Sequence, residues 1–262
     1  MKIAVLYICT GKYNQFFDDF YKTAKTYLLP TAQKVFFVWS DDSKIAEGKN
    51  DVVFYQKAWA GFPADSLYRF ELFKQAEDKV KGFDYVYYFN ANTLFVKKIG
   101  DEILPDESGL IAAEWPIKHR FLKSSVFYHY ERNKKSLAFI PPFKGPYVYY
   151  AGFLNGGTVR EYYMMVDLLI ENIRKDAAND IYACSYDESH LNNYLHYHKC
   201  KKLNAGYCWP EEWNFGSIKE AKIILRDKVR LDPYFNKGRK IGFAGRLHRV
   251  WYLLSRAVSW YF

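Results

Sequence analysis

The fold of this chain is decided by the stretch Tyr85-Val-Tyr-Tyr-Phe-Asn-Ala-Asn-Thr-Leu-Phe95. An aromatic, β-branched run leads into a polar Asn-x-Asn triplet, after which the sequence becomes apolar again. This pattern is typical of a buried strand whose carboxyl end carries the triplet. Because ligands bind outside the carboxyl ends of strands in open α/β sheets, Asn90, Ala91 and Asn92 mark a candidate binding site.

Apolar runs on both sides of this strand have the lengths of strands or the spacing of helices. We expect strands over 2–9, 34–39 and 51–55, and helices over 14–29, 64–80, 160–174 and 187–198, the last with Asp187 as its N-cap. The alternation of strand and helix predicts an α/β fold built on a mainly parallel sheet with flanking helices. Residues 108–157 are rich in Pro, Gly, Tyr and Phe, so we expect short strands and long loops there, the usual place for substrate contacts.

The composition indicates a globular protein with more aromatic residues than its core requires. A chain of 262 residues suits one large α/β domain or two small lobes. Aromatic residues make up 20% of it, more than a core needs, so we expect some rings to line a groove for a sugar face or a base.

Positive charge is concentrated at the C-terminal end. The net charge is +9, and residues 226–262, with nine Lys or Arg and two Asp or Glu, contribute +7 of it. Such a segment suits phosphate groups or an anionic membrane surface. A general nucleic-acid binder is not indicated, because the rest of the chain is nearly neutral.

The last segment, 242–262, interleaves arginines with apolar and aromatic residues at helical spacing. Two interpretations stay open: the helix lies on an anionic membrane surface, or it packs on the body of the protein.

Cysteine and histidine spacing does not indicate a metal site. Cysteines 9, 184, 200 and 208 form no Cys-x-x-Cys pair, and His190, His196 and His198 do not have the spacing of a zinc-binding pair. We expect free thiols in a reducing compartment. The N-terminal stretch is too short for a signal peptide, and no apolar run reaches the ~18 residues of a membrane span. We therefore expect a cytoplasmic protein, with contact to the inner face of the membrane as an option left open by 242–262.

Two further motifs carry chemistry. Asp187 and Glu188 are adjacent carboxylates at a predicted helix start, where the helix dipole favours negative charge and keeps Glu188 ionised. Taken alone, the pair is better explained as a simple helix cap. The stretch Tyr149–Gly157 contains three glycines, which allow close backbone approach to a ligand or simply a turn.

Several motifs in one order resemble a known family over residues 3–215. They are Tyr130-Glu-Arg132 with Ile140-Pro141, then Tyr149–Gly157, Asp187-Glu-Ser-His-Leu-Asn192 and Tyr207-x-Trp209. Together they resemble the retaining glycosyltransferases that include the ABO blood-group transferases and α-1,3-galactosyltransferase. The resemblance implies a GT-A type, Rossmann-like fold with a loop-rich acceptor region. It also implies a donor-binding part over about 1–105 and an acceptor-binding, catalytic part over about 106–225, followed by a basic C-terminal segment over 226–262.

The resemblance also implies roles for individual residues. Glu188 matches the carboxylate that acts as nucleophile or stabilises the oxocarbenium-like state. The implied donor-binding residues are Tyr7, Ile8, Cys9, Tyr13, Arg69, Asn90, Ala91, Asn92, Ala151, Gly152, Phe153 and Asp187, of which Ala151 and Phe153 match positions that choose between galactose and N-acetylgalactosamine. The implied acceptor-binding residues are Trp115, His129, Trp209 and Glu211.

The family usually carries Asp-x-Asp, which holds a divalent metal, where this chain has Asn90 and Asn92. The exchange looks like the bacterial branch of the family, which works without metal. Amides are poorer ligands than carboxylates for a hard cation. Without a metal, carboxylates would repel the donor diphosphate by about 4 kcal/mol per close pair. We therefore expect no cofactor and no divalent metal, and we expect the cations Lys237, Arg239 and Lys240 to stabilise the leaving group.

The predicted activity is retaining transfer of N-acetylgalactosamine from UDP-GalNAc to O3 of a β-galactoside, such as the fucosylated H antigen. The first alternative is α-1,3-galactosyl transfer from UDP-Gal. A non-catalytic sugar-binding module is a further alternative, against which the intact Asp187, Glu188 and Arg69 argue.

Overall fold

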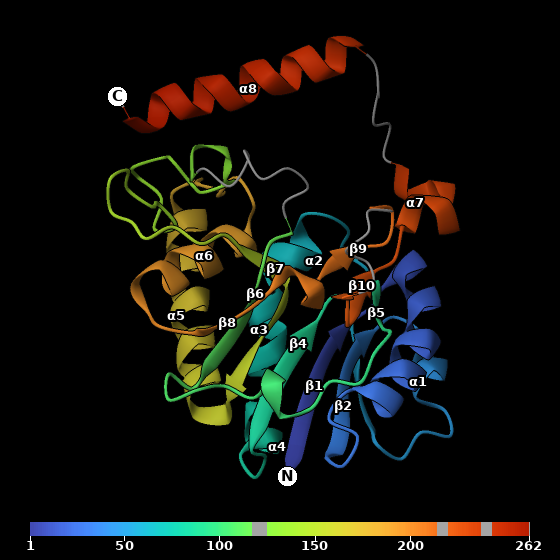
Figure 1. Cartoon of the computed structure of the whole chain (residues 1–262). Coiled ribbons are helices and arrows are strands. Elements are labelled where there is room, and N and C mark those ends of the chain that lie inside the picture. The colour runs from blue at the N-terminus through green and yellow to red at the C-terminus, as the bar shows by residue number, and fades with distance from the viewer. Residues whose placement is uncertain (117–124, 214–219, 237–242, 262) are drawn as a thin grey trace.

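A computed structural model of the chain describes residues 1–116, 125–213, 220–236 and 243–261, and Figure 1 shows the arrangement of its elements. A central sheet has the strand order β3-β2-β1-β4-β7-β6-β8. Its strands are β1 (Lys2–Ile8), β2 (Gln33–Ser40), β3 (Val52–Gln56), β4 (Tyr85–Phe89), β6 (Leu110–Glu114), β7 (Tyr150–Thr158) and β8 (Lys201–Leu203). Strands β1 to β4 are parallel, whereas β7 runs antiparallel to both β4 and β6. The expected mainly parallel α/β sheet is confirmed.

Helices cover both faces of this sheet. Their bounds are α1 (Phe17–Tyr27), α2 (Ala64–Leu67), α3 (Arg69–Lys74), α4 (Glu77–Val80), α5 (Val159–Ala178), α6 (Asp187–Tyr197), α7 (Lys228–Leu231) and α8 (Phe243–Tyr261). Alternate residues of β1 enter two separate cores, as the two-residue period of a strand requires. Val5 packs with α1 on one face, and Leu6 packs with α3 and α5 on the other.

A small second sheet extends the carboxyl end of β4. It has the order β5-β10-β9, formed by β5 (Thr93–Phe95), β10 (Ile223–Leu225) and β9 (Trp209–Pro210). Strand β5 follows β4 almost directly, so the Asn-x-Asn triplet lies in the turn between the two sheets. The start of the basic segment, just after β10, is thereby brought to the same place.

The predicted helix over 64–80 is wrong in one respect, because it is broken into α2, α3 and α4. At the first break the backbone of Tyr68 leaves the helical region, with φ −101° and ψ 18°. Side chains donate hydrogen bonds to backbone carbonyl oxygens near these breaks. Arg69 Nε donates to Ser66 O, and Tyr163 OH donates to Phe73 O. Inserted hydrogen bonds of this kind interrupt the helical ladder.

The N-cap prediction for the helix at 187 is also wrong. Asp187 is the first residue of α6, and Tyr186, with φ 52°, occupies the cap position. The four cysteines are free thiols, as expected. Among the helices described, none combines the length and the apolar character that a bilayer crossing requires.

Candidate active site

The carboxyl end of β4 carries a pair of amides that bond to each other. Asn90 Nδ2 donates to Asn92 Oδ1 at 2.7 Å, and Asn92 Nδ2 donates to Arg226 O at 2.8 Å. The backbone repeats the second contact, because Arg226 N donates to Asn92 O at 2.8 Å. Asn92 is buried and Asn90 is partly exposed. The triplet therefore anchors the root of the C-terminal segment and leaves Asn90 at the surface of the site.

Arg69 connects this strand end to the carboxylates of α6. Its Nε and Nη2 reach the two oxygens of Asp187 at 2.8 and 3.2 Å. Its Nη1 donates to Tyr88 OH at 2.7 Å and to Gly152 O at 3.1 Å. A two-point guanidinium contact of this kind fixes orientation as well as charge. Arg69 thus ties α3, β4, β7 and α6 together at one point.

Glu188 is held by two donors from the other side of the site. Tyr149 OH donates to its Oε1 at 2.5 Å, and the Gly152 N–H donates to its Oε2 at 2.6 Å. A β-carbon on Gly152 would lie 2.9 Å from Glu188 Oε2, so glycine is needed for the close approach. These contacts fix the carboxylate in one orientation, as a nucleophile or cation stabiliser requires.

The ionisation of the carboxylate pair follows from burial and from these partners. Burial raises the pKa of Asp187 to about 7, and the charge of Arg69 opposes that rise. Burial also raises the pKa of Glu188, and hydrogen bonds from Tyr149 and Gly152 oppose it. The pKa of Glu188 is therefore raised overall, because burial outweighs the hydrogen bonds that favour its charged form. Tyr149 keeps its proton, because burial and the nearby Glu188 raise its pKa well above the usual value.

The strand β7 lies so close to the backbone on either side of it that part of the strand has no room for side chains. A β-carbon on Gly156 would lie 2.5 Å from Val86 O, and one on Gly157 would lie 2.2 Å from Gly109 O. Asn192 of α6 fixes the other end of the strand, accepting from Tyr150 N at 2.8 Å and donating to Tyr150 O at 2.9 Å. The glycines of this motif are thus required by strand packing, and Gly152 alone of the three contacts a candidate catalytic group.

The residues expected to hold the nucleotide lie at the carboxyl end of β1 and beyond it. Tyr7 and Cys9 are fully buried, and Tyr7 OH donates to Ala91 O at 2.7 Å, so a ligand contact there would have to use backbone atoms. Tyr13 is partly exposed, and its ring meets Phe235 of the C-terminal segment edge-on at 4.8 Å. Lys12 and Asp232 make a second contact at 3.3 Å. The described root of the basic segment therefore folds over the loop after β1.

The residues expected to bind the acceptor are spread over a wider area. Trp115 lies against Phe153 at 5.3 Å and edge-on to Tyr149, next to Glu188. His129 is exposed, and its carbonyl accepts from Cys184 Sγ. The Glu211 carboxylate accepts from Asp227 N at 2.7 Å, and Trp209 Nε1 donates to Trp213 O at 3.3 Å. Ile8 and Ala151 are placed beside the site by β1 and β7. The predicted cations Lys237, Arg239 and Lys240 lie outside the described residues.

Two site residues were missed from the sequence. Tyr88 bonds to Arg69 and, at 3.4 Å, to Asn90 Oδ1, and Tyr149 bonds to Glu188. Both belong to motifs that the sequence had singled out. Their hydroxyls were not assigned because the sequence does not show which distant side chains they contact.

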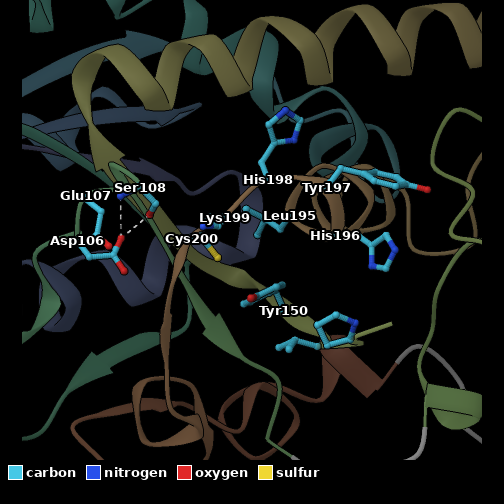
Figure 2. A pocket seen from close by; sticks show the side chains of 12 residues that line it. Asp106, Glu107, Ser108, Tyr150, Leu195, His196, Tyr197, His198, Lys199 and Cys200 are labelled. Atoms are coloured by element: carbon cyan, nitrogen blue, oxygen red, sulfur yellow. Dashed lines mark hydrogen bonds between the residues drawn. The ribbon is translucent and has the colours of Figure 1, made fainter. Parts of the chain in front are cut away.

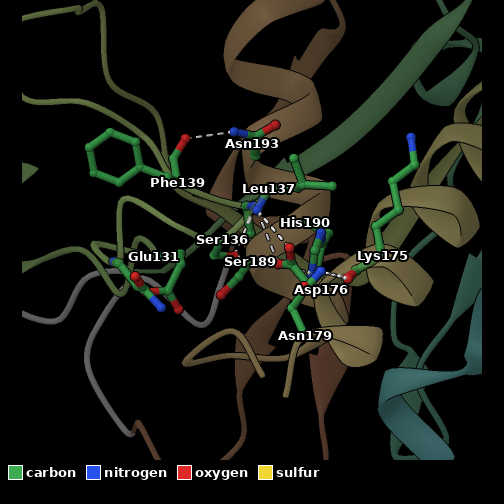
Figure 3. Close-up of polar contacts among 12 residues, drawn as sticks. Glu131, Ser136, Leu137, Phe139, Lys175, Asp176, Asn179, Ser189, His190 and Asn193 are labelled. Carbon is green, nitrogen blue, oxygen red and sulfur yellow. Dashed lines mark hydrogen bonds and ion pairs between the residues drawn. The ribbon is translucent and has the colours of Figure 1, made fainter. Parts of the chain in front are cut away.

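A buried polar network connects α5 with the loop over 131–140, next to the helix α6 that carries Asp187 and Glu188 (Figure 3). Asp176 of α5 accepts from Ser136 Oγ at 2.5 Å and from Leu137 N at 2.9 Å, and His190 Nε2 lies 3.6 Å from it. Burial lowers the pKa of His190 to about 4, so the ring is neutral, and among the described residues its buried Nδ1 has no hydrogen-bond partner. This network fixes the loop over 131–140 against α5 and α6.

Two hollows open elsewhere on the protein. One, of about 460 Å³, is lined by residues that include Tyr150, His196 and Cys200, at the C-terminal end of α6 (Figure 2). The other, of about 640 Å³, is lined by residues that include Phe83, Thr158 and Arg160, near the opposite end of β4. Neither hollow is lined by Arg69, Asp187 or Glu188. The candidate active site is therefore identified from the side-chain contacts described above, and not from the size of a hollow. Within the described ranges, no three His, Cys, Asp or Glu side chains gather closely enough to hold a metal ion.

Comparison with known proteins agrees with this geometry. The model of Glycosyltransferase family 6 matches residues 1–230. The chain is 34% identical to "O-antigen biosynthesis glycosyltransferase WbnI" of Escherichia coli, over 90% of this chain and 99% of that protein. It is 30% identical to "Histo-blood group ABO system transferase 1" of Rattus norvegicus, over 77% of this chain and 59% of that protein. It is 28% identical to "Globoside alpha-1,3-N-acetylgalactosaminyltransferase 1" of Gallus gallus, over 80% of this chain and 62% of that protein.

Proposed function

Because the chain belongs to glycosyltransferase family 6 and is therefore a hexosyltransferase, we propose that it is a retaining α-1,3-N-acetylgalactosaminyltransferase that works without metal. The donor would be UDP-GalNAc and the acceptor a fucosylated β-galactoside. Transfer of galactose from UDP-Gal is the alternative. The name of the avian relative supports N-acetylgalactosamine as the sugar, and 34% identity over nearly the whole length to an O-antigen glycosyltransferase supports a bacterial glycan-building role.

The observation that carries the proposal is the pair of hydrogen bonds that Tyr149 and Gly152 donate to Glu188. A carboxylate bonded at 2.5 Å and 2.6 Å by two fixed donors, and adjacent to the Arg69–Asp187 pair, can face a developing positive charge at an anomeric carbon. Two successive displacements, or a front-face route through an ion pair, would both retain configuration. Asp187 would accept hydrogen bonds from hydroxyls of the donor sugar.

The amide pair supports the metal-free part of the proposal. Asn90 Nδ2 and Asn92 Oδ1 lie 2.7 Å apart, a contact that an amide donor stabilises and that two carboxylates would resist. With amides the site presents no negative charge to the diphosphate at this point. Arg69, in contact with Tyr88 and Gly152, and the cations of 237–240 would then stabilise the leaving group.

A donor and acceptor screen tests the proposal. The full chain is incubated with UDP-GalNAc or UDP-Gal, with 2′-fucosyllactose or lactose, in EDTA or in Mn²⁺. We expect transfer of N-acetylgalactosamine to the fucosylated acceptor in EDTA, with an α linkage by NMR, and transfer about 10²-fold slower or more by Glu188→Gln. Inactivation by EDTA that Mn²⁺ reverses would refute the metal-free assignment, and transfer of galactose alone would move the assignment to the alternative.

A further inference from the structure

The helix α8 has two faces, and only one of them contacts the body of the protein. Trp260 is 2% exposed, and its Nε1 donates to Ile140 O at 2.7 Å. One turn earlier, Arg256 Nη2 donates to Tyr130 O at 2.5 Å. These two residues lie on one side of the helix and attach it to the loops that lie above α6 in Figure 1.

The other side of α8 presents large apolar side chains to solvent. Trp251, Leu254 and Val258 are 67%, 58% and 60% exposed, and Tyr261 is also exposed. Their spacing of three, four and three residues places them on one stripe of a helix with 3.6 residues per turn, opposite Arg256 and Trp260. We call these four residues, together with Phe143, the apolar face.

Phe143 extends the apolar face beyond the helix. Its side chain is 80% exposed at the tip of a loop, and its ring lies 5.1 Å from that of Tyr261. Figure 1 shows α8 crossing the end of the molecule that is opposite the N-terminus, with no other element outside it among those drawn as ribbons. The face is therefore accessible to a flat partner as large as a membrane.

The charge of the surrounding sequence identifies the partner. The segment that leads into and forms α8 carries nine Lys or Arg against two Asp or Glu, and α8 itself contains no acidic residue. A helix with exposed aromatic and aliphatic residues within a basic segment fits the interface of an anionic bilayer. A second copy of the chain would bring the arginines of one α8 against those of the other, with no acidic residue on either helix to offset them, which opposes association through this face.

We propose that the apolar face of α8, with the loop tip at Phe143, binds the surface of an anionic lipid bilayer. Trp260 and Arg256 hold the helix on the protein, and the apolar face inserts at the level of the headgroups. The two interpretations that the sequence left open are then both correct, each for one side of the helix. This proposal does not depend on which sugar the site transfers.

Vesicle flotation tests the proposal on the full chain. The probes are vesicles of phosphatidylcholine alone and vesicles that contain about a third phosphatidylglycerol. The face variant is Trp251→Gln/Leu254→Gln/Val258→Gln, which keeps helix-forming residues at exposed positions. The matched control is Met164→Gln/Leu168→Gln, which removes exposed apolar side chains from α5.

We expect the wild type and the control to float with the anionic vesicles only, and the face variant to bind about tenfold or more weakly. Raising the salt to about 0.5 M should weaken wild-type binding, because it screens the basic segment. Equal flotation of the face variant and the wild type, or no wild-type binding to anionic vesicles, would overturn the proposal. Light scattering that shows a wild-type dimer, separated by the face variant, would assign the face to a second copy instead.

Discussion

The two polar pairs of the site, Asn90 with Asn92 and Asp187 with Glu188, are built in opposite ways. The amides are neutral, bond to each other and hold the start of the C-terminal segment through Arg226. The carboxylates lie at a helix start, Asp187 buried and Glu188 partly buried, and depend on Arg69 and on a fixed donor from β7. The difference shows that negative charge is concentrated on one side of the site and excluded from the other.

The contrast between the neutral amide pair and the carboxylate pair is tested most directly at Glu188. Glu188→Gln keeps the shape but removes the negative charge, so we expect turnover to fall by about 10²-fold or more while donor binding persists. Single-turnover kinetics and calorimetry with UDP measure the two quantities. Glu212→Gln, an exposed glutamate, is the control. Transfer close to the wild-type rate would remove Glu188 from the chemistry.

Gly152→Ala tests whether the position of Glu188 matters as well as its charge. The added carbon would lie 2.9 Å from Glu188 Oε2 and force the carboxylate to move. Displacements near 1 Å can cost about 10²-fold in rate, and we expect a loss of that order in kcat with little change in thermal stability. Gly82→Ala is the matched control, since nothing lies within 4 Å of its added carbon. A rate equal to that of the control would mean that transfer does not depend on the position in which these hydrogen bonds hold Glu188.

Asn92→Asp probes the amide pair. The substitution replaces the N–H donor to Arg226 O by an oxygen and leaves a buried charge facing a carbonyl, so we expect a loss of about 1–3 kcal/mol in the free energy of unfolding. Urea denaturation measures it. Asn179→Asp, whose Nδ2 donates to Lys175 O at the exposed end of α5, should cost less because water can replace the bond. Activation of the wild type by Mn²⁺ would show that the position is a metal site after all.

The smallest expected effect is a pH dependence from Asp187. Its pKa is raised to about 7, so the carboxyl is protonated below that pH and loses its charge toward Arg69. We expect kcat/KM to fall about tenfold per pH unit below about 7, and Asp187→Asn to have a low rate without this limb. For stability the sign is reversed: a raised carboxyl pKa stabilises the folded state least above about pH 7 and progressively more as the pH falls toward 4. A flat profile from pH 5.5 to 8 would contradict the assignment.

The sequence predicts the strands and the order of motifs well, because each is a local pattern. The runs at 2–9, 34–39 and 51–55 are observed as β1, β2 and β3. The second break in the helix over 64–80 was missed, because the side chain that bonds Phe73 O comes from Tyr163, 90 positions away. The role of Tyr149 was missed for the same reason, since Glu188 is 39 positions away and the contact depends on how β7 and α6 pack. The cap at 187 was wrong because Asp187 is drawn to Arg69 instead.

The glycines of β7 have a consequence for engineering. Positions 156 and 157 accept no side chain without moving a neighbouring backbone, whereas Phe153, three residues earlier, is partly exposed against Trp115. A library that randomises this strand should return many active clones changed at 153 and almost none changed at 156 or 157. Substitutions that reshape the surface of the site can therefore be sought at position 153 while positions 156 and 157 of the same strand are left untouched.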